Sequence, residues 1–196
     1  MANRRQEAYR KYCHLPADSS HMTFEAFKVT AGATATAKSL AMQLAEESGQ
    51  EPIKWLTLVS EVDRGKTHLA IAICRRWLDR GKLSRYGYVP LLLDELRGSL
   101  DKEGEGGYRR QFEMLCQVPL LVMDDLGVEK VTEWGLERLN TLVDYRYING
   151  LPLVVTTNRP LDELPIRIAS RLQRFVPGKV VVIDAPEYRL VRKTGG

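Results

Sequence analysis

Residues 55–70 read Trp55-Leu-Thr-Leu-Val-Ser-Glu-Val-Asp-Arg-Gly-Lys-Thr-His-Leu-Ala70, and this stretch is the strongest indication of the fold. The pattern predicts a buried strand, a tight loop that ends in Gly65-Lys66-Thr67, and a helix that begins there. The order matches the phosphate-binding pattern G-x-x-x-x-G-K-[ST], except that Ser60 stands where the first glycine is expected. A chance Gly-Lys-Thr on a surface turn would have the same three residues, so a nucleotide site also requires matching residues elsewhere in the chain.

The residues that end this loop have the chemistry of a phosphate and magnesium site. Gly65 lets the backbone approach a phosphate, and Lys66 supplies a point charge for the terminal phosphates. Thr67 offers a hydroxyl to Mg²⁺, and the free N–H groups at the start of the expected helix 66–80 face the anion. Arg64 and His68 flank these residues and belong to the same candidate cofactor-binding segment.

Composition gives broad limits on the class of protein. The chain has 196 residues, of which 44% are hydrophobic and 28% charged, as expected of a soluble globular protein with one sizeable core. No stretch is long and apolar enough to span a membrane, and the basic N-terminus is not followed by an apolar segment, so we expect a cytoplasmic protein. Three widely spaced cysteines favour reduced thiols over disulfides or zinc. A net charge of +4 mildly favours a polyanionic partner.

Expected strands and helices alternate along most of the chain. Residues 1–22 are polar and basic, and we expect a flexible arm that contacts solvent, DNA or a partner. The expected helices are 33–47, 66–80, 91–101, 108–117, 131–148 and 163–174, and 101–107 is a flexible connector. The expected strands are 54–60, 86–90, 119–123, 151–155 and 179–183. Such alternation predicts an α/β fold with a parallel sheet and helices on both faces.

Polar residues follow two more of the expected strands. Asp124 and Asp125 come directly after one apolar run, and Asn158 ends the Thr-Thr-Asn that follows another. Since ligands bind beyond the carboxyl ends of parallel strands, these side chains are expected near the phosphate-binding loop. An acid there can hold Mg²⁺, and its neighbour can orient an attacking water. Considered alone, Asp124 and Asp125 are also typical of an ordinary turn, and Asn158 is also typical of a loop cap.

The order and spelling of these motifs resemble the DnaC/IstB-like AAA+ ATPases, a family of helicase loaders and transposition helper ATPases. The resemblance covers roughly residues 15–190. It is carried by Phe24-Glu-Ala-Phe27, Gly65-Lys-Thr-His-Leu-Ala70, Leu121-Val-Met-Asp-Asp-Leu-Gly127, Asp144-Tyr-Arg-Tyr147, Leu151-Pro-Leu-Val-Val-Thr-Thr-Asn158, Ile168-Ala-Ser-Arg-Leu172 and Pro186-Glu-Tyr-Arg189. It implies a three-layer αβα P-loop NTPase fold, an AAA+ core over 23–192 without a full C-terminal lid domain, and a tail at 193–196.

The resemblance also implies roles for single residues. Lys66 and Thr67 correspond to the Walker A pair, and Asp124 corresponds to the Walker B aspartate that holds Mg²⁺. Asp125 stands at the position of the catalytic acid. Asn158 corresponds to sensor 1. The implied cofactors are therefore ATP and Mg²⁺.

Two arginines have two interpretations each, and a third has one. Arg171 resembles the arginine finger that reaches the ATP of a neighbouring subunit, or is an ordinary surface arginine. Arg189 resembles a sensor-2 arginine, or is structural. Arg146 is interpreted as one partner of an internal salt bridge. A finger that acts in trans implies homo-oligomers that assemble with ATP, on single- or double-stranded DNA, and act with a replicative helicase or a transposase.

Two substitutions in the loop predict a weakened site. The family has glycine at the positions of Ser60 and Asp63, and the carboxylate of Asp63 would lie near a polyphosphate. At about 5 Å and an effective dielectric constant of ~20, the repulsion is roughly 3 kcal/mol per unit charge. We therefore expect weak ATP binding or hydrolysis, and the alternative function is a nucleotide-weak or non-hydrolysing AAA+ scaffold. A small-molecule kinase, a third class with this loop, would need an arginine-rich lid that the sequence does not show.

Overall fold

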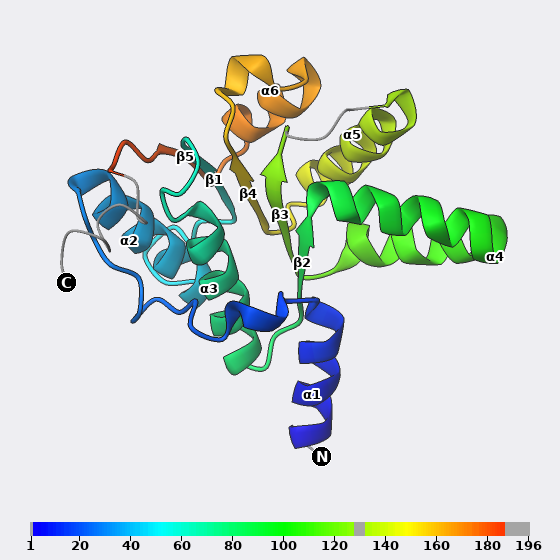
Figure 1. Cartoon of the computed structure of the whole chain (residues 1–196), viewed down its shortest axis with the longest axis horizontal. Coiled ribbons are helices and arrows are strands. Elements are labelled where there is room, and N and C mark those ends of the chain that lie inside the picture. The colour runs from blue at the N-terminus through cyan, green and yellow to red at the C-terminus, as the bar shows by residue number, and fades with distance from the viewer. Residues whose placement is uncertain (1, 128–131, 187–196) are drawn as a thin grey trace.

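The computed structural model describes residues 2–127 and 132–186. Five parallel strands form one sheet in the order β2-β3-β4-β1-β5. They are β1 (Trp55–Val59), β2 (Ser84–Tyr88), β3 (Leu120–Leu126), β4 (Leu153–Thr157) and β5 (Gly178–Val182). Helices lie on both sides of this sheet (Figure 1). The predicted α/β class and the parallel sheet are confirmed.

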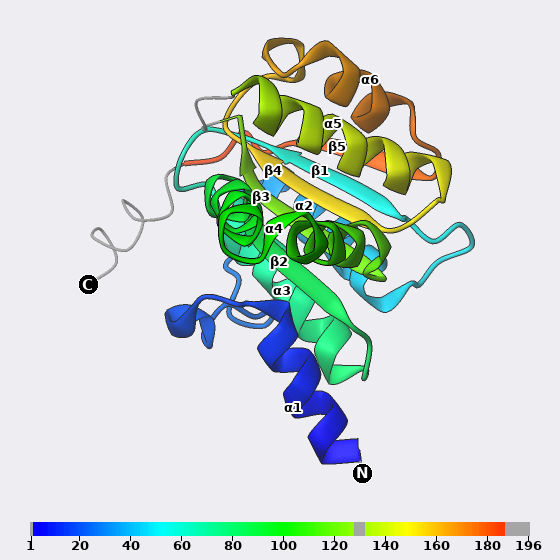
Figure 2. The same ribbon diagram turned by 90° about the vertical axis from the view of Figure 1, so that its right-hand side faces the viewer.

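Two hydrophobic cores fill the space between the sheet and its helices. One core lies under α2 (Gly32–Glu46) and α3 (Lys66–Asp79), and the other under α4 (Val89–Gln117), α5 (Glu133–Ile148) and α6 (Ile166–Arg174). Figure 2 shows α5 and α6 together on one side of the sheet. All residues of β1 and β4 are buried, because a covered parallel sheet needs apolar side chains on both of its faces.

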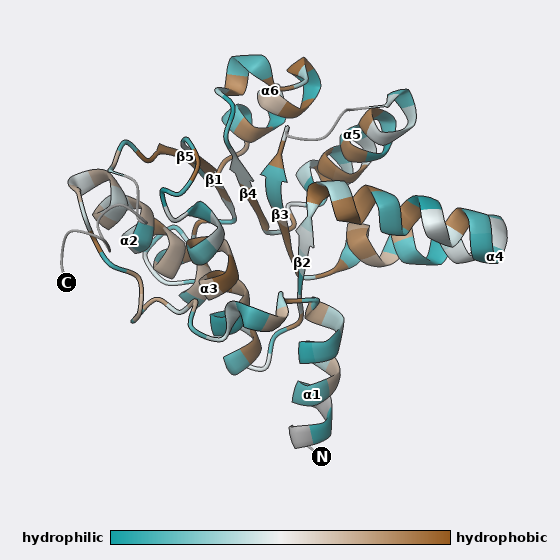
Figure 3. Cartoon of the chain, in the orientation of Figure 1, coloured by the Kyte–Doolittle hydropathy of each residue, from teal (hydrophilic) through white to brown (hydrophobic). Residues whose placement is uncertain are grey.

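The N-terminal segment differs from the expected flexible arm. Residues Ala2–Cys13 form helix α1, which packs against β2 and α3. The side chain of Cys13 is fully buried, whereas Arg10 and Lys11 are exposed. Most of the helix is hydrophilic (Figure 3), so its sequence has too little apolar periodicity to predict a helix. The division of the chain into arm, core and tail stays a prediction.

Helix α4 is a hairpin that projects from the sheet. Its two limbs lie side by side in Figures 1 and 2, and Gly104 interrupts them with φ 67° and ψ −166°. Such a backbone conformation is open to glycine and closed to most other residues. The flexible connector expected over 101–107 is therefore wrong, because a single glycine reverses the chain and its neighbours remain helical.

Within residues 2–127 and 132–186, no helix combines the length and the apolar character that crossing a membrane requires. No helical domain follows β5 within those residues either.

Candidate functional site

A cleft of about 420 Å³ lies at the carboxyl ends of β1, β3 and β4. Most of the predicted site residues line it, although they come from separate segments of the sequence. The lining residues are His21, Met22, Val62, Asp63, Arg64, Gly65, Lys66, Thr67, His68, Asp125 and Asn158. The position of the cleft follows from the parallel topology, in which the loops after the strands meet at one edge of the sheet.

The loop between β1 and α3 contains two left-handed residues. The φ angle is 60° at Asp63 and 90° at Gly65. Aspartate is one of the few residues with a side chain that tolerate this region, so Asp63 can take the place of glycine without changing the path of the backbone. Gly65 has no such freedom, because a Cβ there would lie 2.7 Å from Cε2 of Phe27.

The amine of Lys66 lies over the loop and is held by three acceptors. Its Nζ donates to the carbonyl oxygen of Ser60 at 2.8 Å, to Oγ of Ser60 at 3.0 Å and to the carbonyl oxygen of Glu61 at 2.7 Å. Burial lowers the pKa of Lys66, and the charges of Asp125 and Asp124 oppose that shift. Ser60 is thus more than a neutral replacement for glycine, since its hydroxyl binds the amine that a phosphate would recruit.

The carboxylate of Asp124 is surrounded by hydroxyl donors. Thr67 Oγ1 lies 3.1 Å from Oδ2, the Tyr86 hydroxyl lies 2.6 Å from the same oxygen, and Thr156 Oγ1 lies 2.6 Å from Oδ1. Burial, followed by the charge of Asp124, raises the pKa of Tyr86, so its hydroxyl remains a donor. The two predicted magnesium ligands, Thr67 and Asp124, are therefore in contact. Sequence analysis did not identify Tyr86 or Thr156.

Asp125 points into the cleft because the strand bulges at this point. Its φ is 64°, the pairing of β3 with β4 shifts between Met123 and Leu126, and its N–H donates to Thr156 Oγ1 at 2.8 Å. Burial and then the charge of Asp124 raise the pKa of Asp125, while a hydrogen bond with Asn158 lowers it. A carboxylate and an amide in contact can orient a water molecule and accept its proton.

Arg171 lies outside the cleft of its own chain. Its Nε donates to Oδ1 of Asp144 at 2.9 Å, and its guanidinium carbon lies 4.4 Å from the centre of the Tyr147 ring. Arg167 forms an ion pair with the same carboxylate. Burial raises the pKa of Asp144, but the hydrogen bonds from Arg171 and Arg167 outweigh it and lower the value. Asp144 thus has two basic partners on α6.

Arg146 is internal, as predicted, but the predicted salt bridge is wrong. Its side chain is fully buried, and burial lowers its pKa to about 9. Among the described residues its guanidinium donates to backbone carbonyls, those of Leu115, Cys116, Pro119 and Pro152. These carbonyls lie at the end of α4 and in the loops before β3 and β4, and they accept the buried guanidinium in place of an acid.

The remaining predicted residues have other partners or fall outside the described part. Arg64 pairs with Glu61 at 2.9 Å. Nε2 of His68 lies 2.7 Å from the carbonyl oxygen of Thr23, so this nitrogen contacts the chain's own backbone although the residue lines the cleft. Arg189 lies outside the described residues.

The donor set of the cleft fits a nucleotide with Mg²⁺. Its volume lies within the range of roughly 300–1,000 Å³ that is typical of ligand pockets. Lys66 and the N-terminus of α3 favour an anion, and Thr67 and Asp124 offer the oxygen ligands that Mg²⁺ prefers. The carboxylate of Asp63 is the one lining group of the loop that opposes a polyphosphate.

The sheet order, the loop after β1, the acids after β3 and the asparagine after β4 define a P-loop NTPase of the AAA+ type. The sequence matches a family model described as "IstB-like ATP binding protein" over residues 1–190. The chain belongs to the IstB-like ATP-binding protein family.

Curated relatives include proteins of insertion sequences and of replication. The chain is 27% identical over 205 residues to a Mycobacterium tuberculosis protein named as the ATP-binding protein Rv3427c in an insertion sequence, and the match covers 100% of this chain and 79% of that protein. It is 27% identical over 150 residues to the replicative helicase loader DnaC of Escherichia coli, covering 76% of this chain and 60% of DnaC. The chain spans 46% of another relative, YqaM of Bacillus subtilis.

Solved structures show the same fold. The crystal structure of the DnaC helicase loader superposes with a TM-score of 0.74 at 22% identity, covering 86% of this chain and 100% of that one. The replication initiator DnaA, bound to AMPPCP and single-stranded DNA, gives a TM-score of 0.74 at 20% identity, covering 89% of this chain and 54% of DnaA. At these identities the likeness establishes the AAA+ fold.

Proposed function

We propose that this chain is an AAA+ ATPase that binds ATP with Mg²⁺ and assembles through nucleotide at subunit interfaces. The observation that carries this proposal is the contact of Thr67 Oγ1 with Asp124, 3.1 Å apart in space and 57 residues apart in the sequence. Thr67 lines the cleft together with Lys66, and this contact brings the second proposed magnesium ligand, the buried Asp124, against Thr67. A chance Gly-Lys-Thr turn would not have an acid from β3, which β4 separates from β1 in the sheet, against its threonine.

Each side chain of the cleft has a role in the proposed reaction. Lys66 and the first N–H groups of α3 bind phosphate oxygens, and Thr67 and Asp124 hold the metal. When bound, Mg²⁺ supplies positive charge that offsets the charge of the phosphates. Asp125 and Asn158 orient the attacking water, and Asp125 accepts its proton.

Assembly is proposed from the position of Arg171. This arginine lies on α6 and outside the cleft of its own chain, so it can complete a site only in a neighbouring subunit. The ion pair with Asp144 does not prevent this role. If Arg171 moves away, Asp144 keeps Arg167 as its partner, and no carboxylate is left unpaired.

The names of two kinds of relative support the proposed partners. A homologue named for an insertion sequence supports action with a transposase, and homologues named replicative helicase loaders support action with a helicase. Assembly on DNA is consistent with the net charge of +4, because phosphate contacts dominate the affinity of proteins for DNA.

A non-hydrolysing scaffold is the second candidate. Two features of the loop favour it. The amine of Lys66 already donates hydrogen bonds to acceptors of the loop, and Asp63 adds negative charge to the cleft. Such a protein would keep the fold and its surfaces while binding nucleotide weakly.

Measurement of ATP hydrolysis with and without single-stranded and duplex DNA separates the two functions. We expect Mg²⁺-dependent hydrolysis that Lys66→Ala abolishes. The exposed Lys54, outside the cleft, provides the matched control, and Lys54→Ala is expected to keep the activity. Absence of hydrolysis with nucleotide still bound would favour the scaffold, and an equal rate in Lys66→Ala would contradict the assigned site.

A further inference from the structure

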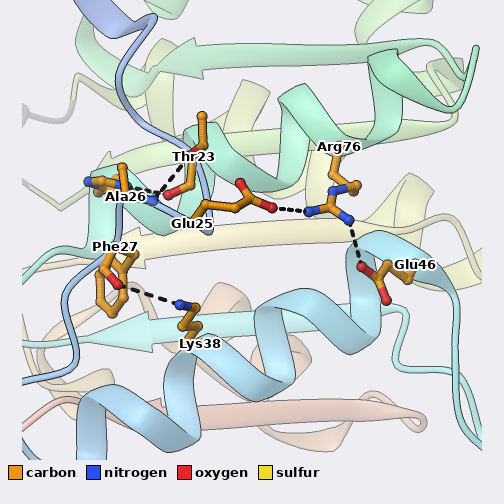
Figure 4. Close-up of polar contacts among 8 residues, drawn as sticks. Thr23, Glu25, Ala26, Phe27, Lys38, Glu46 and Arg76 are labelled. Carbon is orange, nitrogen blue, oxygen red and sulfur yellow. Dashed lines mark hydrogen bonds and ion pairs between the residues drawn. The ribbon is translucent and has the colours of Figure 1, made fainter.

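A short turn before α2 packs against the start of α3. Within residues 23–27, the carbonyl oxygen of Thr23 accepts the N–H of Phe27 at 3.1 Å, and Thr23 Oγ1 accepts the N–H of Ala26 at 3.2 Å. Figure 4 shows this turn beside α2 and α3. Phe24 and Phe27 are both buried, which fixes the turn to the hydrophobic core.

The ring of Phe27 contacts the phosphate-binding loop. A Cβ on Gly65 would lie 2.7 Å from Cε2 and 3.3 Å from Cζ of Phe27, so the edge of the ring faces the α-carbon of Gly65. The ring also meets His68 edge-on, with the ring centres 5.3 Å apart and the planes at 76°. Phe27 therefore contacts residues on both sides of Lys66 and Thr67.

Hydrogen bonds from two helices hold the turn in place. Nε2 of His68, on α3, donates to the carbonyl oxygen of Thr23 at 2.7 Å, because a carbonyl can only accept. Lys38, on α2, donates to the carbonyl oxygen of Phe27 at 3.4 Å (Figure 4). Burial lowers the pKa of His68, which favours the neutral ring with one N–H.

An ion pair fixes the outer end of the same turn. Arg76, on α3, contacts Glu25 at 2.7 Å and Glu46, on α2, at 2.9 Å (Figure 4). Its guanidinium carbon lies 5.6 Å from the centre of the Phe24 ring. Phe24 thus has its charged contact near the C-terminal end of α3, whereas the loop precedes the N-terminal end. The two phenylalanines share one turn and one core but face different neighbours.

We propose that Phe27 is a positioning residue of the phosphate-binding loop. Its ring occupies the space beside the α-carbon of Gly65 and restricts a glycine that has a left-handed φ of 90° and no side chain of its own to limit it. A loop held in its binding conformation loses less entropy when it binds a ligand. The inference rests on the proposed function, in which this loop binds nucleotide.

Two leucine substitutions test this role. Phe27→Leu removes Cε and Cζ, the atoms nearest Gly65, and Phe24→Leu makes the same change away from the loop. In titrations with ATP and Mg²⁺ we expect about a tenfold rise in Kd for Phe27→Leu and less than about a twofold rise for Phe24→Leu. Amide hydrogen exchange over residues 61–66, without nucleotide, should become faster in Phe27→Leu and stay unchanged in Phe24→Leu.

A double-mutant cycle gives an independent measure. Where Phe27 is present, the methyl group that Gly65→Ala adds would clash with its ring. Gly65→Ala should therefore weaken ATP binding by a larger factor in a chain with Phe27 than in a chain with Phe27→Leu. Equal effects of the two leucine variants on Kd and exchange, or a strictly additive cycle, would overturn the proposal. If Phe27→Leu fails to fold, Phe27→Met is used in its place. A wild type that binds no nucleotide contradicts the proposed function alone, because the exchange experiment still tests Phe27.

Discussion

Asp63→Asn is the change that isolates the cost of a negative charge in the phosphate-binding loop. Asp63 lines the cleft with a φ of 60°, and its charge acts on Lys66, where it contributes to raising the pKa of the amine against burial. Asparagine has nearly the same shape and also tolerates the left-handed region, so only the charge changes.

The expected magnitude follows from Coulomb's law. A phosphate charge about 5 Å from the carboxylate, at an effective dielectric constant of ~20, is repelled by roughly 3 kcal/mol, which corresponds to about a hundredfold in affinity. Because Arg64 and Mg²⁺ offset part of this charge, we expect Asp63→Asn to tighten ATP binding by about tenfold to a hundredfold at low salt. Asp63→Gly is expected to give a similar gain, since the backbone conformation is already the one that glycine would adopt.

Isothermal titration with ATP and Mg²⁺ at low and high ionic strength measures this effect. Salt shortens the range of electrostatic interactions, so the difference between the wild type and Asp63→Asn should shrink as salt is added. An unchanged affinity in Asp63→Asn at low salt would show that the charge of Asp63 does not weaken ATP binding. A gain in Asp63→Gly alone would assign the cost to the backbone instead of the charge.

Three further changes test the rest of the site. Thr156→Val removes the hydroxyl that links Asp124 to the N–H of Asp125. Because an unpaired buried group costs about 1–3 kcal/mol, kcat should fall by about tenfold or more. Thr156→Ser keeps the hydroxyl and should keep the kcat of the wild type. Arg171→Ala should lower kcat but leave ATP affinity unchanged, and mixing it with Lys66→Ala chains should restore hydrolysis. The pKa of Asp125 is raised in the folded protein, so its carboxylate becomes protonated at a higher pH than an ordinary aspartate does. The rate of ATP hydrolysis should therefore decline as the pH falls through this raised pKa.

Each of these expectations has an outcome that would contradict it. A Thr156→Val variant with the kcat of the wild type would show that the hydroxyl does not position the acids. Failure of the mixed chains to recover activity would argue against an arginine that acts in trans. An acid limb that persists in Asp125→Asn would have to come from another group.

The fold was largely predictable from the sequence because its elements are encoded locally. The mainly apolar stretches that form β1, β3 and β4 end at polar residues, and α3 and α5 stop at Gly81 and at Asn149-Gly150. Helix α1 and the shape of α4 were not predictable in this way. The first is too polar for a clear periodicity, and the second depends on the φ of one glycine, Gly104.

The sequence predicted the site residues that belong to a motif, but not those that only the tertiary structure brings to the site. Lys66, Thr67 and Asp124 stand in recognisable patterns, and the structure places Thr67 against Asp124. Tyr86 and Thr156 reach the same carboxylate only because β2 and β4 flank β3 in the sheet. A single sequence contains no signal for that adjacency.

The proposed function depends on nucleotide-dependent assembly, which sedimentation of the wild-type chain measures. We measure the size of the protein with and without ATP, Mg²⁺ and DNA, alongside Lys66→Ala under the same conditions. We expect larger assemblies of the wild type only when ATP and Mg²⁺ are present, and none in Lys66→Ala. A wild type whose size is the same with and without nucleotide, or a Lys66→Ala variant that assembles equally well, would contradict it.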